Sequence, residues 1–272
     1  MLCVYTIVET GSYGWASAHT AGFGALSALL MGAFVVRQVT TRNPLLALHI
    51  LRSRNVGGAN LIQALMVAGM LGFFFLCTLY LRQVLGYRPL EIGLGFLPVA
   101  VAIGALSLGF SARLSTRFGA RAILVPGLAS IATALALLTR APVHSAYTTQ
   151  LLPAMVLLGV GAGLSFPPLM TLGMSGVAPS DRGIASGLVN TTAQVGGALG
   201  LAVLATVSES RTNALLSQGH GTASALTGGF HLVFAIGAGL MAAAILLALT
   251  VLQSLDAEAS SNQGRPPPAA TR

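Results

Sequence analysis

The 272-residue sequence contains no lysine, only two cysteines and one tryptophan, and its charged residues make up just 7% of the chain. Soluble globular domains carry roughly a quarter of their residues as charged side chains. Cys3 and Cys77 both lie in apolar segments, so they predict neither a disulfide framework nor a metal site. With 54% hydrophobic residues, the composition predicts a polytopic membrane protein.

Acidic residues are equally scarce, and all six lie at the ends of apolar segments or in loops: Glu9, Glu91, Asp181, Glu209, Asp256 and Glu258. An ionisable side chain inside a membrane span would be the first candidate for a proton relay, and the apolar runs contain none. The 14 basic residues are all arginine and are scattered singly between apolar runs. Because they do not cluster on a soluble face, we expect no nucleic-acid partner.

The sequence also lacks the residue patterns of common hydrolases. The five histidines lie near the ends of apolar runs or in loops, and neither a GxSxG nor an HExxH pattern occurs. An intramembrane enzyme is therefore the weakest interpretation. We expect no catalytic residues, no cofactor and no metal.

What the sequence does contain is a series of long apolar runs. Each is long enough to cross all or most of a hydrocarbon layer of ~30 Å at ~1.5 Å per residue. They predict seven spans: Thr20–Val36, Asn55–Leu81, Ile92–Ala112, Ala122–Thr139, Tyr147–Leu172, Asp181–Val207 and Gly228–Leu252. Proline predicts a bend at Pro98 in the third span, and a kink or local opening at Pro167 and Pro168 in the fifth.

The segments outside these spans have their own patterns. Met1–Val8 is apolar but too short to span, and resembles the end of a helix that begins upstream. Between Arg37 and Arg54, four arginines surround the apolar stretch Pro44–Leu51, which favours a helix lying in the membrane interface. The last residues, 256–272, are rich in proline, serine and alanine and are expected to be disordered.

The sixth span has a small and polar face inside an otherwise apolar segment. At 3.6 residues per turn, this face contains Gly183, Gly187, Asn190, Gln194 and Gly197. Two pairs with GxxxG spacing, Gly183/Gly187 and Gly196/Gly200, predict close packing against other helices. Asn190 and Gln194 either pack against neighbouring helices or line a solute path, and helix periodicity does not distinguish the two.

Arginine counting predicts the orientation, because basic residues in short loops stay in the cytoplasm. Ten arginines fall on one side: Arg37, Arg42, Arg52, Arg54, Arg113, Arg117, Arg121, Arg182, Arg265 and Arg272. The other side has four: Arg82, Arg88, Arg140 and Arg211. We expect a cytoplasmic C-terminus and, since the first helix remnant would come from the cytoplasm, at least one further crossing upstream.

The loop between the third and fourth spans, residues 112–121, reads ARLSTRFGAR and carries a family resemblance. It resembles the short cytoplasmic signature of the major facilitator superfamily, which follows a Gly-x-Leu-x-Asp-Arg-x-Gly-Arg-Arg pattern. The matching residues are Arg113, Leu114, Arg117, Phe118, Gly119 and Arg121. Ala112 and Thr116 depart from the pattern, replacing its leading glycine and its acidic residue.

Longer phrases are similar to the fourteen-helix drug:proton antiporters of the EmrB/QacA type: DRGIASGLVNTTAQVGGALGLAV, PLLALHILRSRNVGGANLIQ and LYLRQVLGYRPLEIGLGFLPVA. The resemblance implies an all-α polytopic membrane protein. Residues 1–18 would hold a helix remnant and external loop, 19–54 an extra helix and linker, 55–255 the C-terminal six-helix bundle of two inverted three-helix repeats, and 256–272 a cytoplasmic tail.

The same resemblance implies a multidrug efflux function in the cell inner (plasma) membrane. The solute cavity would lie at the midplane and be bordered by Gln63, Phe74, Asn190 and Gln194. Expected partners are the lipid bilayer, a small amphipathic or cationic drug-like substrate, protons, and either a missing N-terminal bundle or a second copy. Two alternatives stay open: a self-associating half-transporter and a non-transporting membrane scaffold.

Overall fold

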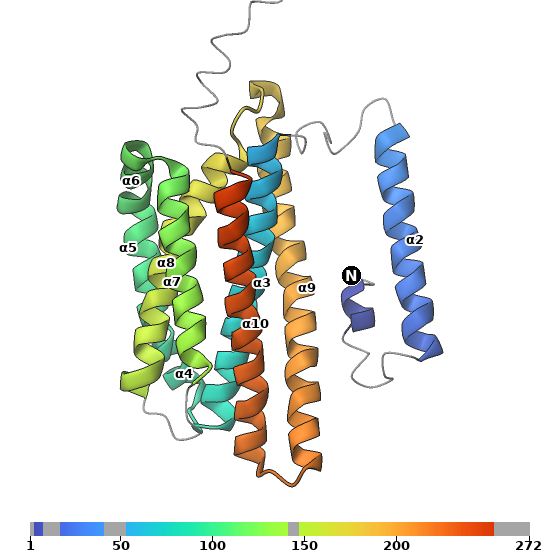
Figure 1. Cartoon of the computed structure of the whole chain (residues 1–272), viewed down its shortest axis with the longest axis vertical. Coiled ribbons are helices and arrows are strands. Elements are labelled where there is room, and N and C mark those ends of the chain that lie inside the picture. The colour runs from blue at the N-terminus through green and yellow to red at the C-terminus, as the bar shows by residue number, and fades with distance from the viewer. Residues whose placement is uncertain (1–2, 8–16, 41–52, 141–146, 253–272) are drawn as a thin grey trace, which may run out of the picture.

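Helices account for all regular secondary structure in the part of the chain that the computed structural model describes, residues 3–7, 17–40, 53–140 and 147–252 (Figure 1). Within these ranges, six helical segments are long and apolar enough to cross a membrane: Arg54–Gln83, Pro89–Phe118, Ala120–Leu138, Tyr147–Gly173, Pro179–Ser217 and Thr222–Thr250. The prediction of an all-α polytopic membrane protein is thus confirmed.

The six segments contain the following elements. They are α3 (Arg54–Gln83), then α4 (Pro89–Gly95), α5 (Leu97–Ala105), the π-helix η2 (Leu106–Phe110) and α6 (Ser111–Phe118), then α7 (Ala120–Leu138). These are followed by the π-helix η3 (Tyr147–Leu151) with α8 (Leu152–Gly173), the 3₁₀ turn η4 (Pro179–Asp181) with α9 (Arg182–Ser217), and finally α10 (Thr222–Thr250).

The N-terminal part stands beside this bundle. Helix α2 (Ala18–Thr40) lies apart from the six segments in Figure 1, and its apolar portion, Ala18–Ala33, is shorter than theirs. Residues 3–7 are helical, and the Thr206 hydroxyl of α9 donates a hydrogen bond to the carbonyl of Ile7 at 3.4 Å. The interfacial helix expected at Pro44–Leu51 and the tail at 256–272 lie outside the described residues.

One predicted loop is wrong, because α9 runs beyond the predicted end of its span at Val207 as far as Ser217. The charges of Glu209 and Arg211 end the apolar run, but charged side chains do not break a helix. The helix instead ends at a tight turn around Gly219, whose φ of 86° suits glycine. The connection between α9 and α10 is therefore only a few residues long rather than the expected stretch from Ser208 to Thr227.

The third span also differs from its predicted bounds. Its helix is interrupted at Phe96, two residues before Pro98, and then continues through η2 and α6 to Phe118. The signature segment, predicted as a loop, is thus mostly helical. Only Gly119, with φ of 86°, separates α6 from α7.

Helices α3 and α8 contact each other, and each packs against two further helices. Helix α3 packs against α9 and α10, whereas α8 packs against α5 and α7, and α7 and α10 also meet. Most of these contacts pair up when α3, α9 and α10 are exchanged for α8, α5 and α7, in that order. Helix α9 also packs against α10, and this contact has no counterpart of similar extent between α5 and α7, so the two proposed three-helix repeats are packed differently.

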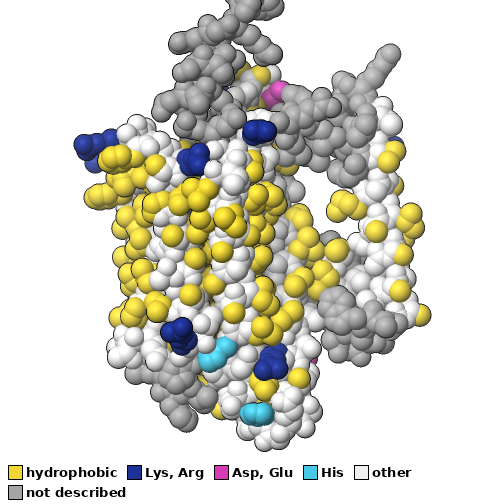
Figure 2. All heavy atoms as spheres, viewed as in Figure 1, with side chains coloured by type: hydrophobic (Ala, Val, Ile, Leu, Met, Phe, Trp, Pro, Cys, Tyr) yellow, Lys and Arg dark blue, Asp and Glu magenta, His cyan; other side chains and the backbone are white. Residues whose placement is uncertain are grey.

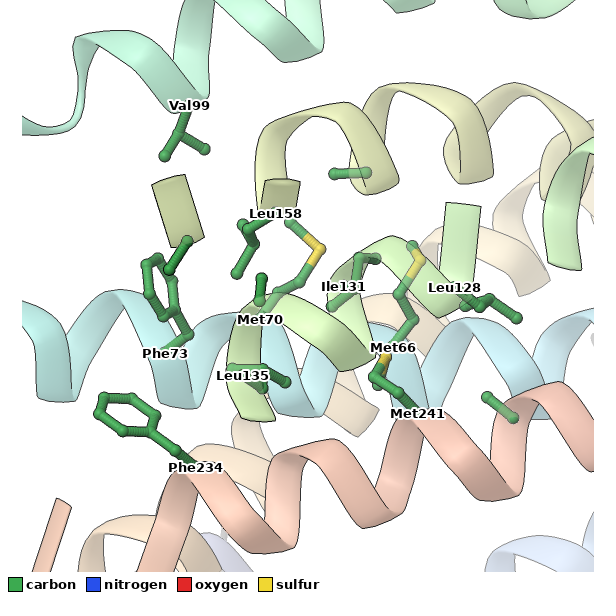
Figure 3. Packing of buried hydrophobic residues seen from close by; sticks show 14 of the residues in the cluster. Met66, Met70, Phe73, Val99, Leu128, Ile131, Leu135, Leu158, Phe234 and Met241 are labelled. Atoms are coloured by element: carbon green, nitrogen blue, oxygen red, sulfur yellow. The ribbon is translucent and has the colours of Figure 1, made fainter. Parts of the chain in front are cut away.

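The core between these helices is built from large apolar side chains. Figure 3 shows side chains of α3 meeting those of α7, α8 and α10. Met66, Leu128, Ile131, Leu158 and Met241 are all completely buried. Because lipid is as apolar as these side chains, the helices are held together by close packing more than by hydrophobic transfer.

Glycine allows close approaches between helices, including the contacts of α5 with α8 and of α3 with α9. A Cβ atom at Gly159 of α8 would lie 2.8 Å from the carbonyl oxygen of Val99 in α5. A Cβ atom at Gly196 or Gly200 of α9 would lie 2.7 Å from the Cα atom of Ala64 or Ala68 in α3. Any side chain at these glycines would collide with backbone.

Candidate functional site

The polar face of α9 is exposed in its first half. Asn190 and Gln194 are both exposed, and the Asn190 amide donates to the carbonyl of Ser186 at 3.0 Å. An added Cβ at Gly183 or Gly187 would meet no other atom within 4 Å. Among the described residues no neighbour packs against these two glycines, so their packing role stays a prediction.

The second half of the same helix is packed against α3. Gly197 faces Val67 and Leu71, while Gly196 and Gly200 face Ala64 and Ala68. Asn190 lies seven residues before Gly197 and so shares its side of α9. The two helices thus touch along one half of this face and leave Asn190 and Gln194 uncovered in the other.

Gln63 and Phe74 lie on α3, along the side that meets α9. Gln63 precedes Val67 by four residues and Phe74 follows it by seven, so all three share one helix face. Gln63 is buried, and its amide oxygen makes no hydrogen bond with a described residue. Phe74 is half-buried, and its ring centroid lies 5.4 Å from that of Phe96. Gln63 therefore lies beneath the surface near the contact between α3 and α9, Asn190 and Gln194 are exposed on α9, and Phe74 packs against Phe96.

Helix α8 passes unbroken through Pro167 and Pro168, where the sequence predicts a kink or local opening. Proline has no N–H group, so these residues leave the carbonyls of Gly163 and Leu164, four positions earlier, without helical partners. The hydroxyl of Ser107 donates to the Gly163 oxygen at 3.4 Å, and that of Ser111 donates to the Leu164 oxygen at 3.2 Å. Neighbouring side chains thus supply the donors that the prolines lack.

Sequence analysis did not identify Ser107 and Ser111. The proline pair signals that two carbonyls need outside donors, but the sequence does not reveal which residues reach them. The π-helix η2 and the start of α6 place both serines against α8. The hydrogen bond from the Tyr147 hydroxyl to the carbonyl of Gly95, at 2.7 Å, was likewise not foreseen and ties the other end of α8 to α4.

Four of the matching signature residues, Arg117, Phe118, Gly119 and Arg121, line a groove of about 1020 Å³ at the end of the bundle where α6 and α7 meet. The guanidinium of Arg121 donates to the Leu249 carbonyl at 2.6 Å, and the guanidinium carbon of Arg117 lies 5.3 Å from the centre of the Phe118 ring. Arg113 is exposed and Leu114 half-buried on α6. Pro126, Pro167 and other residues of α7, α8 and α10 line the rest of the groove.

Comparison with known proteins assigns the sequence to a family. The family model described as the Major Facilitator Superfamily matches residues 1–201. The chain therefore belongs to the Major Facilitator Superfamily.

Three relatives illustrate the similarity to proteins of known name. The chain is 35% identical to the puromycin resistance protein pur8 of Streptomyces alboniger over 92% of its own length and 51% of the relative. It is 38% identical to the cephamycin export protein CmcT of Amycolatopsis lactamdurans over 76% of the chain and 43% of the relative. It is 28% identical to the lincomycin resistance protein LmrB of Listeria monocytogenes over 86% of the chain and 50% of the relative. The chain spans about half the length of these relatives.

Proposed function

We propose that this chain is the C-terminal half of a proton-coupled multidrug efflux transporter of the fourteen-helix EmrB/QacA type. Relatives named for antibiotic resistance or export support a drug efflux role. The proposed half-transporter comprises the six-helix bundle at residues 55–255, the preceding helix and linker at 19–54, the helix remnant and external loop at 1–18, and a cytoplasmic tail at 256–272.

The observation that carries the proposal is the open polar face of α9. Asn190 and Gln194 are exposed on a helix that is apolar enough to cross a membrane. In hydrocarbon such amides seek hydrogen-bond partners, and polar groups at this depth face protein or a water-filled cavity. We therefore place a second bundle opposite this face, with the solute path between the two.

The solute path in this proposal is a mostly apolar cavity with a few amides. Asn190 and Gln194 would border it directly, and Phe74 would supply an apolar wall. Gln63 would contribute its unpartnered amide oxygen after a modest rearrangement along the contact between α3 and α9. Such a lining suits amphipathic molecules, because few polar contacts fix their orientation.

Proton coupling would depend on the other half. Among the described residues, the acids are Glu91, Asp181 and Glu209, which lie near the ends of helical segments. We therefore assign the titratable group that responds to the proton gradient to the first bundle.

The test is transport by the 272-residue chain reconstituted in liposomes with an imposed pH gradient. We expect no gradient-dependent movement of a fluorescent cationic dye by the chain alone, and movement when a matching first bundle is co-reconstituted. In the restored system, Asn190→Ala and Gln194→Ala should change the relative rates for different dyes with unchanged protein incorporation. Movement by the chain alone at the rate of the restored pair would refute the need for a first bundle.

A self-associating half-transporter is a second candidate, because a second copy would also cover the exposed α9 face. Cross-linking of a single cysteine at Gln194, after replacement of Cys3 and Cys77, distinguishes the candidates. A second copy predicts a covalent homodimer in the membrane whether or not a first bundle is present. A first bundle predicts that its presence abolishes the homodimer.

The proposed topology makes a separate prediction. In this proposal the protein lies in the cell inner (plasma) membrane with its C-terminus in the cytoplasm. A cysteine at Ser115 in α6 should therefore label only from the cytoplasm. A cysteine at Gly219, in the turn after α9, should label only from outside, because one complete span, α10, separates this turn from the cytoplasmic C-terminus. The measurement uses an impermeant maleimide on intact cells and on inverted vesicles of a variant lacking Cys3 and Cys77. Labelling of both positions from one side would refute the orientation.

A further inference from the structure

We propose that the groove beside the signature segment binds an acidic phospholipid, with the phosphate held by Arg117 and Arg121 and the acyl chains lying along the apolar rim of α6. This site is separate from the polar face of α9. It lies at the end of the bundle, where the chain turns between two membrane-crossing segments at Gly119.

The charged residues that line the groove are positive. Among the described residues, the lining contains Arg117 and Arg121 and no acidic side chain. Arg113 adds a further positive charge one helical turn before Arg117. Among the described residues, neither Arg113 nor Arg117 forms an ion pair with a carboxylate, so the positive charge is not neutralised within this part of the protein. Basic pockets between membrane helices favour anionic headgroups.

The geometry also leaves donors for a phosphate. Arginine carries five N–H donors, and Arg121 uses one of its nitrogens on the Leu249 carbonyl, which fixes the guanidinium at the groove wall. Arg117 also lines the groove, so a phosphate diester there can accept charge-assisted hydrogen bonds from both arginines.

The surroundings fit a lipid better than a free anion. The groove, at about 1020 Å³, is at the upper end of the ~300–1,000 Å³ range of small-molecule pockets, and much of its lining is apolar. Phe118 is 59% exposed and Phe110 64% exposed on the same segment. Figure 2 shows arginine side chains beside hydrophobic ones at the end of the bundle where Figure 1 places α6. Charged heads flanked by exposed apolar side chains are typical of the membrane interface.

The test is native mass spectrometry of the purified 272-residue chain released from mixed micelles that contain phosphatidylglycerol or phosphatidylcholine. We expect retention of phosphatidylglycerol in preference to phosphatidylcholine. Arg117→Gln and Arg121→Gln should each weaken phosphatidylglycerol binding about fivefold, and the double variant should weaken it roughly 25-fold. Each arginine near an anionic lipid contributes a similar amount to the binding free energy. The matched control is Arg82→Gln with Arg140→Gln, two exposed arginines at the opposite end of the bundle, which should change nothing.

Several outcomes would overturn the proposal. Equal retention of phosphatidylcholine would show that the groove binds acyl chains without selecting the headgroup. Displacement of phosphatidylglycerol by inorganic phosphate would show that the groove binds a free anion. An equal loss of phosphatidylglycerol binding in the control variant would show that the binding depends on the overall surface charge and not on the groove. Because Arg121→Gln also removes the cap on α10, circular dichroism must show unchanged helicity, and Arg117→Gln, which leaves that cap intact, must show the loss by itself.

Discussion

Replacing Gly200 by leucine is expected to abolish most of the folded protein, whereas the same replacement at Gly187 is tolerated. Both glycines lie on α9. At Gly200 an added Cβ would lie 2.7 Å from the Cα atom of Ala68, so α3 and α9 would have to separate. The contact is with backbone and cannot be relieved by a rotamer change. We expect a loss of about 3 kcal/mol or more, at the upper end of overpacking effects.

The measurement is the yield of monodisperse protein in detergent and its thermal midpoint. Gly187→Leu is the matched control, because an added Cβ there meets no atom within 4 Å. Gly200→Ala gives a graded intermediate, since its single methyl group already reaches Ala68. Equal yields for Gly200→Leu and Gly187→Leu would contradict the packing of α9 against α3. In a complete transporter, a harmful Gly187→Leu would indicate that another bundle covers the exposed half of the face.

The contrast between these glycines shows what sequence alone could and could not provide. Helix existence followed from apolar run length, and the second span, predicted at Asn55–Leu81, closely matches α3 at Arg54–Gln83. The positions of the glycines at a spacing of 3.6 residues per turn also predicted that they share one face of α9. The sequence did not reveal which part of this face meets a neighbour, because both GxxxG pairs have the same local pattern and only tertiary packing separates them.

Helix ends were predicted less well than helix positions. Run length marks where apolar character stops, and a helix continues beyond that point until a turn residue ends it. For this reason α9 passes through Glu209 and Arg211, and α6 extends through the signature segment to Phe118. The groove between α6, α7 and α8 was not predictable, because its lining comes from segments far apart in the sequence.

The second large effect is expected at the proline pair of α8. Ser111→Ala removes the donor to the Leu164 carbonyl, which Pro168 leaves without a helical partner. Ser111 is completely buried, and water cannot easily replace its hydroxyl. Leaving a buried carbonyl unsatisfied costs about 1–3 kcal/mol. Ser107→Ala should cost less, because its hydrogen bond to Gly163 is longer, at 3.4 Å.

A double-mutant cycle separates this mechanism from simple loss of packing. Pro168→Ala restores the N–H group that bonds to the Leu164 carbonyl within an ordinary helix. Ser111→Ala should therefore destabilise the chain by about 1–2 kcal/mol when Pro168 is present and by a few tenths when it is replaced. The free energy is measured by reversible unfolding in detergent, with Ser180→Ala at an exposed site as the matched control. Equal costs of Ser111→Ala in both backgrounds would show that the serine acts through packing, and that the carbonyls freed by the prolines find partners elsewhere.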